Sequence, residues 1–158
     1  MTPARHTPLS KLVTGGHLEQ VPVDSATCRE LVHQASNHAL TAVAARDLGD
    51  FEGAFQIAYD GCRKVCLALA LSYGVRAKGA TGHHAATFNA AAATLSSNIV
   101  ARDLVDEATD LRFIRAGSEY RAEKITVAAV NDSIDILGGL LAALPPVMDA
   151  RLASSPTE

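Results

Sequence analysis

Apolar residues recur every three or four positions along most of the chain, which is the spacing of one face of an α-helix. The clearest example begins after Asp50, a residue type that often caps a helix N-terminus, and ends at the sequence "SYG". This pattern predicts a long helix with a broad buried face. The stripe consists of Phe51, Ala54, Phe55, Ala58, Cys62, Val65, Cys66 and Leu69.

Another long helix is predicted just before it, from the N-cap candidates Asp24 or Ser25 to about Leu48, where Gly49 follows as a C-cap. Because only about two residues join the two helices, we expect them to lie antiparallel. Upstream, "PLSKLVTGG" predicts one short helix closed by its two glycines. The face of the long helix carries Leu31, Ala35, His38, Ala42 and Ala45.

Three more helices are predicted in the second half of the chain. The first is capped by Thr81 and covers "HHAATFNAAAATL", and the second runs from about Ile99 to Tyr120. The third covers roughly residues 125–144, and Pro145 and Pro146 are expected to end or kink it. The apolar stripe of the second is expected to be Val100, Leu104, Ala108, Leu111 and Ile114 or Arg115.

No stretch alternates between apolar and polar residues for long enough to predict a strand, and "VRAKGATG" is expected to be a basic, glycine-bearing loop. The chain is therefore predicted to be all-α, an up-and-down bundle of four to five helices. We expect an N-terminal segment with a short helix over residues 1–23, a helical bundle domain over 24–144, and a C-terminal tail over 145–158.

Composition and charge narrow the function. Of the 158 residues, 48% are hydrophobic and 20% are charged, which is typical of a globular domain. The net charge of −3 and the pI of about 6.0 mean that any nucleic-acid role needs a local cationic patch. No apolar run approaches the ~20 residues of a membrane span. The N-terminus lacks a secretory apolar region, so we expect a soluble, cytoplasmic protein.

The cysteines and short motifs point away from several activities. Cys28, Cys62 and Cys66 form no CxxC pair, so we expect reduced thiols in the core. Cys62 and Cys66 share one helix face, but neither HExxH nor paired CxxC accompanies them, and we expect no metal and no cofactor. The chain has no GxxxxGK[ST], GxSxG or GxGxxG motif, which argues against a conventional kinase, hydrolase or dehydrogenase.

The stretch "LRFIRAGSEY", residues 111–120, gathers candidate functional side chains. Helical spacing places Arg115 beside Glu119 and brings Arg112 close to Arg115. We expect Arg115 and Tyr120 to line a polar notch between packed helices that no imidazole reaches. The alternative is an ordinary i,i+4 ion pair, with Tyr120 as a partly buried packing residue.

The stretch "GVRAKGATGHH" gathers a further set. Arg76 and Lys78 precede a predicted helix N-terminus that carries His83 and His84, and such an end attracts anions. The alternative is a solvated loop with one satisfied histidine. In the preceding helix, Tyr59 can carry its hydroxyl to a polar cluster, or simply pack with one hydrogen bond.

The order of these pieces resembles the HEPN superfamily, the all-α domains of prokaryotic toxin–antitoxin and defence systems. The resemblance covers roughly residues 24–144 and rests on "GAFQIAYDGCRKVCLALALSYGVRAKGATGHHAATFNA", followed by "LRFIRAGSEY" and a closing helix. Ribonucleases of this family are metal-independent dimers that use an arginine followed closely by a histidine. By position, Arg115 matches that arginine, Ala116 stands where asparagine is common, and Tyr120 replaces the histidine.

This replacement shapes the expected function, because a tyrosine with a pKa near 10 is a poor base at neutral pH. The resemblance implies a noncatalytic homodimer that binds RNA, a nucleotide or a partner protein, as one component of a pair with a toxin, an antitoxin or a nucleotidyltransferase. One alternative is a ribonuclease toxin that uses Arg115, or Arg76 with His83 or His84. Another is a helical scaffold without a nucleic-acid role. The expected binding residues are Tyr59, Arg76, Lys78, His84, Arg112, Arg115, Glu119 and Tyr120.

Overall fold

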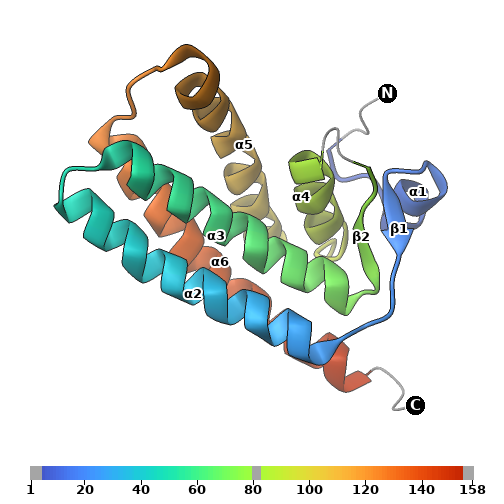
Figure 1. Cartoon of the computed structure of the whole chain (residues 1–158). Helices are drawn as coiled ribbons and strands as arrows, with labels where there is room; N and C mark the ends of the chain where they lie inside the picture. The colour runs from blue at the N-terminus through green and yellow to red at the C-terminus, as the bar shows by residue number, and fades with distance from the viewer. Residues whose placement is uncertain (1–4, 80–82, 155–158) are drawn as a thin grey trace.

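The structure, a computed structural model, describes residues 5–79 and 83–154 and is mainly helical (Figure 1). The predicted all-α class is therefore confirmed, although two short strands accompany the helices. The elements in chain order are α1 (Leu9–Thr14), β1 (Leu18–Gln20), α2 (Ser25–Asp47), α3 (Phe51–Ser72), β2 (Val75–Ala77), α4 (His83–Ala93), α5 (Ile99–Arg121) and α6 (Val127–Ser154).

Helices α2 and α3 form the antiparallel pair that the sequence predicts (Figure 1). Asp24 caps α2 by accepting hydrogen bonds from the backbone amides of Ala26 and Thr27, at 3.0 and 3.3 Å. Asp50 caps α3 by accepting from the amide of Gly53 at 2.9 Å. Between them Gly49 turns the chain with a φ of 86°, which glycine adopts without strain. Local side-chain caps thus fix where each of the two helices begins.

Helix α3 lies at the centre of the core, between α2, α6 and α4 (Figure 1). Gly61 lets α6 approach closely, because a Cβ at that position would lie 2.7 Å from a Leu137 methyl group. The three cysteines are free and buried, as predicted, and burial raises the pKa of Cys62 to about 12. The largest fully buried side chains of the core include Phe55, Phe88, Leu69, Leu137, Leu140 and Leu144.

The expected loop at "VRAKGATG" is wrong for its first residues, which form strand β2. Strands β1 and β2 pair antiparallel, with Glu19 opposite Arg76. Val75 and Ala77 are buried while Arg76 is exposed, so the strand does alternate, but three residues are too few to show a period of two. This sheet packs α1 onto the ends of α3 and α4 through a small second core of Leu12, Leu18, Ala70, Val75 and Ala90. The predicted cap Thr81 lies outside the described residues.

Helix α5 has the predicted bounds within one residue, but its apolar stripe is only partly the predicted one. Ala108 and Leu111 are buried as predicted, whereas Val100 is 73% exposed and Ile114 is also exposed. Ala101 and Val105 face the core instead. The stripe was misplaced because Ala101 is smaller and less apolar than its neighbour Val100.

Helix α6 does not end near Leu144. It continues through Pro145 and Pro146 to Ser154, so residues 145–154 are not a loose tail. Leu144 and Met148 are buried on either side of the prolines, and this packing compensates for the two missing amide donors. The helix is long and apolar enough to cross a membrane by length and composition, contrary to the expectation that no run approaches that length. Core helices pass the same test, and α6 packs against α3, α2 and α5.

Candidate functional site: a cationic cluster around Tyr59

The inner face of α5 changes character halfway along the helix. In its first half the face carries Ala101, Val105 and Ala108, which are fully buried. One and two turns later the same face carries Arg112 and Arg115. The predicted ion pair is present, with an Arg115 nitrogen 2.8 Å from a Glu119 oxygen, and the Arg115 side chain is only 30% exposed. Half-buried charges on an inward face require polar groups on the facing helices.

Tyr59 of α3 is the centre of those facing groups. Its side chain is almost fully buried, and the Arg115 guanidinium lies 5.4 Å from the centre of its ring. The Tyr59 hydroxyl lies 3.2 Å from Nδ1 of His84 on α4, and its ring also meets the edge of Phe88. Three helices therefore meet here, and the guanidinium of Arg115 and the imidazole of His84 both contact the buried phenol of Tyr59.

The surroundings hold His84 neutral at physiological pH. Burial lowers the pKa of His84 below its usual value near 6.5, and the positive charges of Arg63 and Arg115 lower it further. Burial also raises the pKa of Tyr59, opposed by Arg115, Arg63 and Arg112. The hydroxyl thus stays protonated, and a single hydrogen bond joins its oxygen to Nδ1 of His84. Either Tyr59 donates to His84 or His84 donates to Tyr59.

Asp60, next to Tyr59 on α3, anchors a second layer of charge. One carboxylate oxygen accepts from Nε and an Nη of Arg63 at 3.0 and 2.7 Å. The other lies 3.0 Å from Nε2 of His38 and 3.4 Å from Nζ of Lys64. Burial favours the neutral form of Asp60, but the hydrogen bonds and charges of Arg63, His38 and Lys64 more than offset it and lower its pKa.

The cluster has more positive than negative groups. It contains Arg63, Lys64, Arg112 and Arg115 against the carboxylates of Asp60 and Glu119, so an acidic protein carries a local cationic excess.

Two buried nitrogens of this region, Nε2 of Gln56 and Nε of Arg112, have no hydrogen-bond partner within the described residues. Gln56 lies one turn before Asp60 on the same face of α3. A buried donor without a partner costs about 1–3 kcal/mol, so these two nitrogens locally reduce the stability of the fold.

Several predicted residues lie elsewhere. Tyr120 is 80% exposed, so the expected notch formed by Arg115 and Tyr120 is wrong. Five helical residues turn the chain by about 140°, which carries Tyr120 away from the inner face. Arg76 pairs with Glu19 across the sheet. His83 bonds the Gly79 carbonyl through Nδ1 at 3.2 Å, and Lys78 is exposed beyond β2.

The expectation that no imidazole reaches this region is also wrong, because His84 contacts Tyr59 beneath Arg115. The sequence predicts Tyr59, His84 and Arg115 as separate candidates and does not indicate Gln56, His38 or Arg63. The available signal was the polar stripe of Gln56, Asp60 and Arg63 on α3, at spacings of four and three. Nothing in that stripe indicates which helix faces it.

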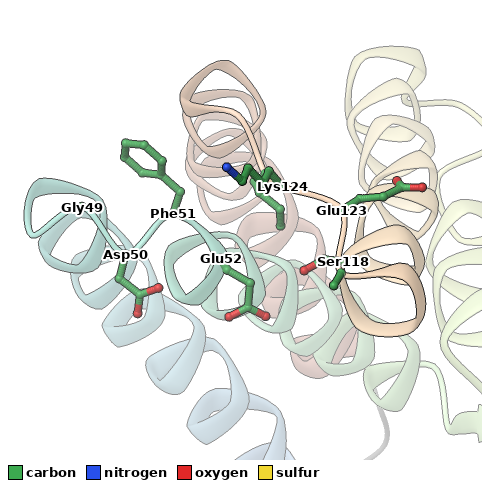
Figure 2. A pocket seen from close by; sticks show the side chains of 9 residues that line it. Gly49, Asp50, Phe51, Glu52, Ser118, Glu123 and Lys124 are labelled. Carbon is green, nitrogen blue, oxygen red and sulfur yellow. The ribbon is translucent and has the colours of Figure 1, made fainter.

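Other hollows of the molecule have a different character. One of about 480 Å³ lies between the α2–α3 turn and the link from α5 to α6, where Glu52 and Lys124 are among the lining residues (Figure 2). Another, between α5 and α6, is lined by Glu107, Asp110, Asp132 and Asp135. Among residues 5–79 and 83–154, no group of three or more His, Cys, Asp or Glu side chains is placed to hold a metal ion.

Comparison with protein-family models, with curated proteins and with solved structures yields no match to this chain. Guanidinium groups, a neutral imidazole and a phenol in a half-buried setting are suited to an oxyanion, above all to a phosphate group.

Proposed function

We propose that this protein binds the phosphate group of a nucleotide or of RNA at the cluster around Tyr59. The observation that carries the proposal is the meeting of Arg115, Tyr59 and His84 from three helices, in a half-buried cluster with excess positive charge. Arginine binds phosphate oxygens through two parallel N–H groups, and partial burial strengthens such bonds. The acidic balance of the whole chain disfavours nonspecific binding along a duplex, which suits a small local site.

The hydrogen bond between Tyr59 and His84 supports a binding role in one of its two forms. When the Tyr59 hydroxyl donates to Nδ1, the proton of the neutral imidazole is on Nε2, which can then donate to a phosphate oxygen. Arg112 adds a further positive charge, close enough to Tyr59 to oppose the rise that burial causes in the pKa of its hydroxyl.

The resemblance to HEPN domains is compatible with this site, since the segments that carry it supply Tyr59, His84 and Arg115. On that basis we extend the proposal to a HEPN-like homodimer that serves as one component of a toxin–antitoxin or defence pair. The protein then acts by holding a phosphate-bearing ligand, and its partner is the component that acts on RNA or on nucleotides.

A ribonuclease is the second candidate, and the other proton position favours it. When Nδ1 of His84 donates to Tyr59, Nε2 is an unprotonated base, and the positive charge of Arg115 acts on the same imidazole. Nε2 would take the proton of a ribose 2′-hydroxyl, whose oxygen attacks the adjacent phosphorus and forms a cyclic phosphate. The 5′-oxygen leaves with a proton from water, and Arg115 stabilises the charge on the phosphoryl oxygens.

Binding is tested by fluorescence anisotropy with a short labelled single-stranded RNA and with inorganic phosphate as competitor. Arg115→Gln is expected to weaken RNA binding by about tenfold or more, because it removes a charge-assisted bond. Arg46→Gln is the matched control: Arg46 is also 30% exposed and also pairs with a carboxylate, on α2. Equal affinities for the two variants would refute the phosphate site.

The two candidates are separated by incubating RNA with the protein in the presence of a metal chelator. Intact RNA together with tight binding supports the binding role. Cleavage that disappears in His84→Gln, with RNA affinity retained, identifies the ribonuclease and replaces the binding proposal.

A further inference from the structure

A groove of about 500 Å³ runs beside the outer face of α3, between the start of α2 and strand β2. Leu67 and Leu71 of α3 and the residues Val21 and Pro22 before α2 give it an apolar lining. Its volume lies in the range of small-molecule sites, which typically combine apolar walls with a few polar groups.

Polar groups stand along this groove. Asp24 keeps an ionised carboxylate, because the Thr27 hydroxyl and amide bond to it and lower its pKa. Arg76 pairs with Glu19 through Nε, which leaves its terminal nitrogens to donate elsewhere. His83 donates from Nδ1 to the Gly79 carbonyl when it is neutral, so Nε2 is an acceptor. The groove therefore offers both donors and acceptors around an apolar floor.

The groove and the cluster around Tyr59 are near each other at two points, on α3 and at the start of α4. Leu67 follows Arg63 by one turn on the same face of α3, an advance of about 6 Å along the helix. His83 lines the groove and His84 contacts Tyr59, and the centres of their rings are 6.5 Å apart. A ligand held by Arg63 and His84 at one end can reach the apolar floor with its next chemical group.

We propose that this groove receives the nucleobase of the unpaired nucleotide whose phosphate binds at the cluster around Tyr59. The inference rests on the proposed function and adds the class of ligand: a phosphate ester with a base. A base has apolar faces that cover Leu67 and Leu71, and its edge carries N–H and carbonyl groups that match Asp24 and Arg76. An acyl chain would cover the leucines but leave those polar groups unused.

The test measures affinities for inorganic phosphate, ribose 5-phosphate and a nucleoside monophosphate by calorimetry. The wild-type protein is expected to bind the nucleoside monophosphate about tenfold more tightly than ribose 5-phosphate, because only the former has a base to stack. Leu67→Trp fills the groove and should abolish this preference while it leaves the affinity for ribose 5-phosphate unchanged. Leu40→Trp, which adds the same ring at an exposed position of α2, should keep the preference.

A short single-stranded RNA forms a parallel arm, and it should lose affinity in Leu67→Trp by the same factor as the mononucleotide. Arg76→Ala, an exposed change that leaves the core intact, should reduce the preference without affecting inorganic phosphate. A preference that survives Leu67→Trp and Arg76→Ala, or that is absent from the wild type, overturns the nucleobase groove. If phosphate and ribose 5-phosphate bind Arg115→Gln as well as wild type, the phosphate site itself is refuted.

Discussion

The two halves of α5 present the same inner face to the rest of the molecule in opposite ways. In the first half Val105 and its alanine neighbours are sealed in the core, and in the second half Arg115 and Glu119 occupy the equivalent positions. Burial of a side chain such as Val105 stabilises a fold by about 1.5–3 kcal/mol, whereas a half-buried ion pair contributes little. The second half therefore gives up packing energy, as is expected if the proposed phosphate site lies there.

The outer face of the second half of α5 is also unusual, because it exposes aromatic side chains. Phe113 is 62% exposed and Tyr120 is 80% exposed, while Arg112 and Arg115 are partly buried. Helices that serve only a core bury their aromatic residues and expose their charges. Arg112 lies 4.9 Å from the ring centre of Phe113 and so connects the two faces. Under the proposed function, the residues for stability and those for binding are thus separated along one helix.

Val105→Asp tests the packed first half of α5 and should have the largest effect on stability. An unpaired carboxylate at this fully buried position is expected to cost about 4 kcal/mol or more of unfolding free energy. Val100→Asp, on the same helix but 73% exposed, should cost less than about 1 kcal/mol. Urea unfolding followed by circular dichroism measures both, and similar midpoints for the two variants would contradict the assigned inner face.

Arg115→Met tests the charged end in the same way. The change removes an ion pair that is about one-third exposed but keeps an unbranched side chain over Tyr59, so stability should fall by no more than about 1 kcal/mol. Phosphate binding should be lost in the same protein. A loss of stability comparable to that of Val105→Asp would mean that Arg115 is a structural residue.

The sequence predicts features that depend on local signals and misses features that depend on packing. Helices with a local cap and a clear stripe, such as α2 and α3, were predicted almost to the residue, because both signals are local. Strand β2 and the passage of α6 through Pro145 depend on packing against distant segments, and no local pattern reports that packing.

The site was predicted as separate residues and not as an assembly. Helical spacing correctly paired Arg115 with Glu119, since both are on one helix. It could not reveal that His84 lies against Tyr59, because that contact is set by how α4 packs on α3. The prediction that Tyr120 lies beside Arg115 is wrong for a similar reason. It rests on the spacing of the family motif and not on the direction in which each side chain leaves the helix.

The protonation of His84 tests the charges that surround it. Because burial, Arg63 and Arg115 lower its pKa in the folded state, the unfolded chain takes up a proton first as pH falls below about 6.5. Stability should therefore decline from that pH down to the folded pKa, and level off below it. A proton NMR titration of His84 should give a midpoint below 6.5, and Arg115→Met should move it upward. A wild-type midpoint above 6.5 would contradict the cationic surroundings.

The smallest effect is expected where α5 ends, at Ala122. Its φ of 50° lies in the left-handed region, and its amide bonds the Gly117 carbonyl as a helix C-cap. Glycine adopts this conformation without strain, so Ala122→Gly should stabilise the protein by about 0.5 kcal/mol. The greater flexibility that glycine gives to the unfolded chain reduces this gain. Ala116→Gly, inside the same helix, should instead destabilise it by about 1 kcal/mol. Thermal unfolding measures the two opposite signs, and a destabilising Ala122→Gly would show that this end of α5 is held by something other than its cap.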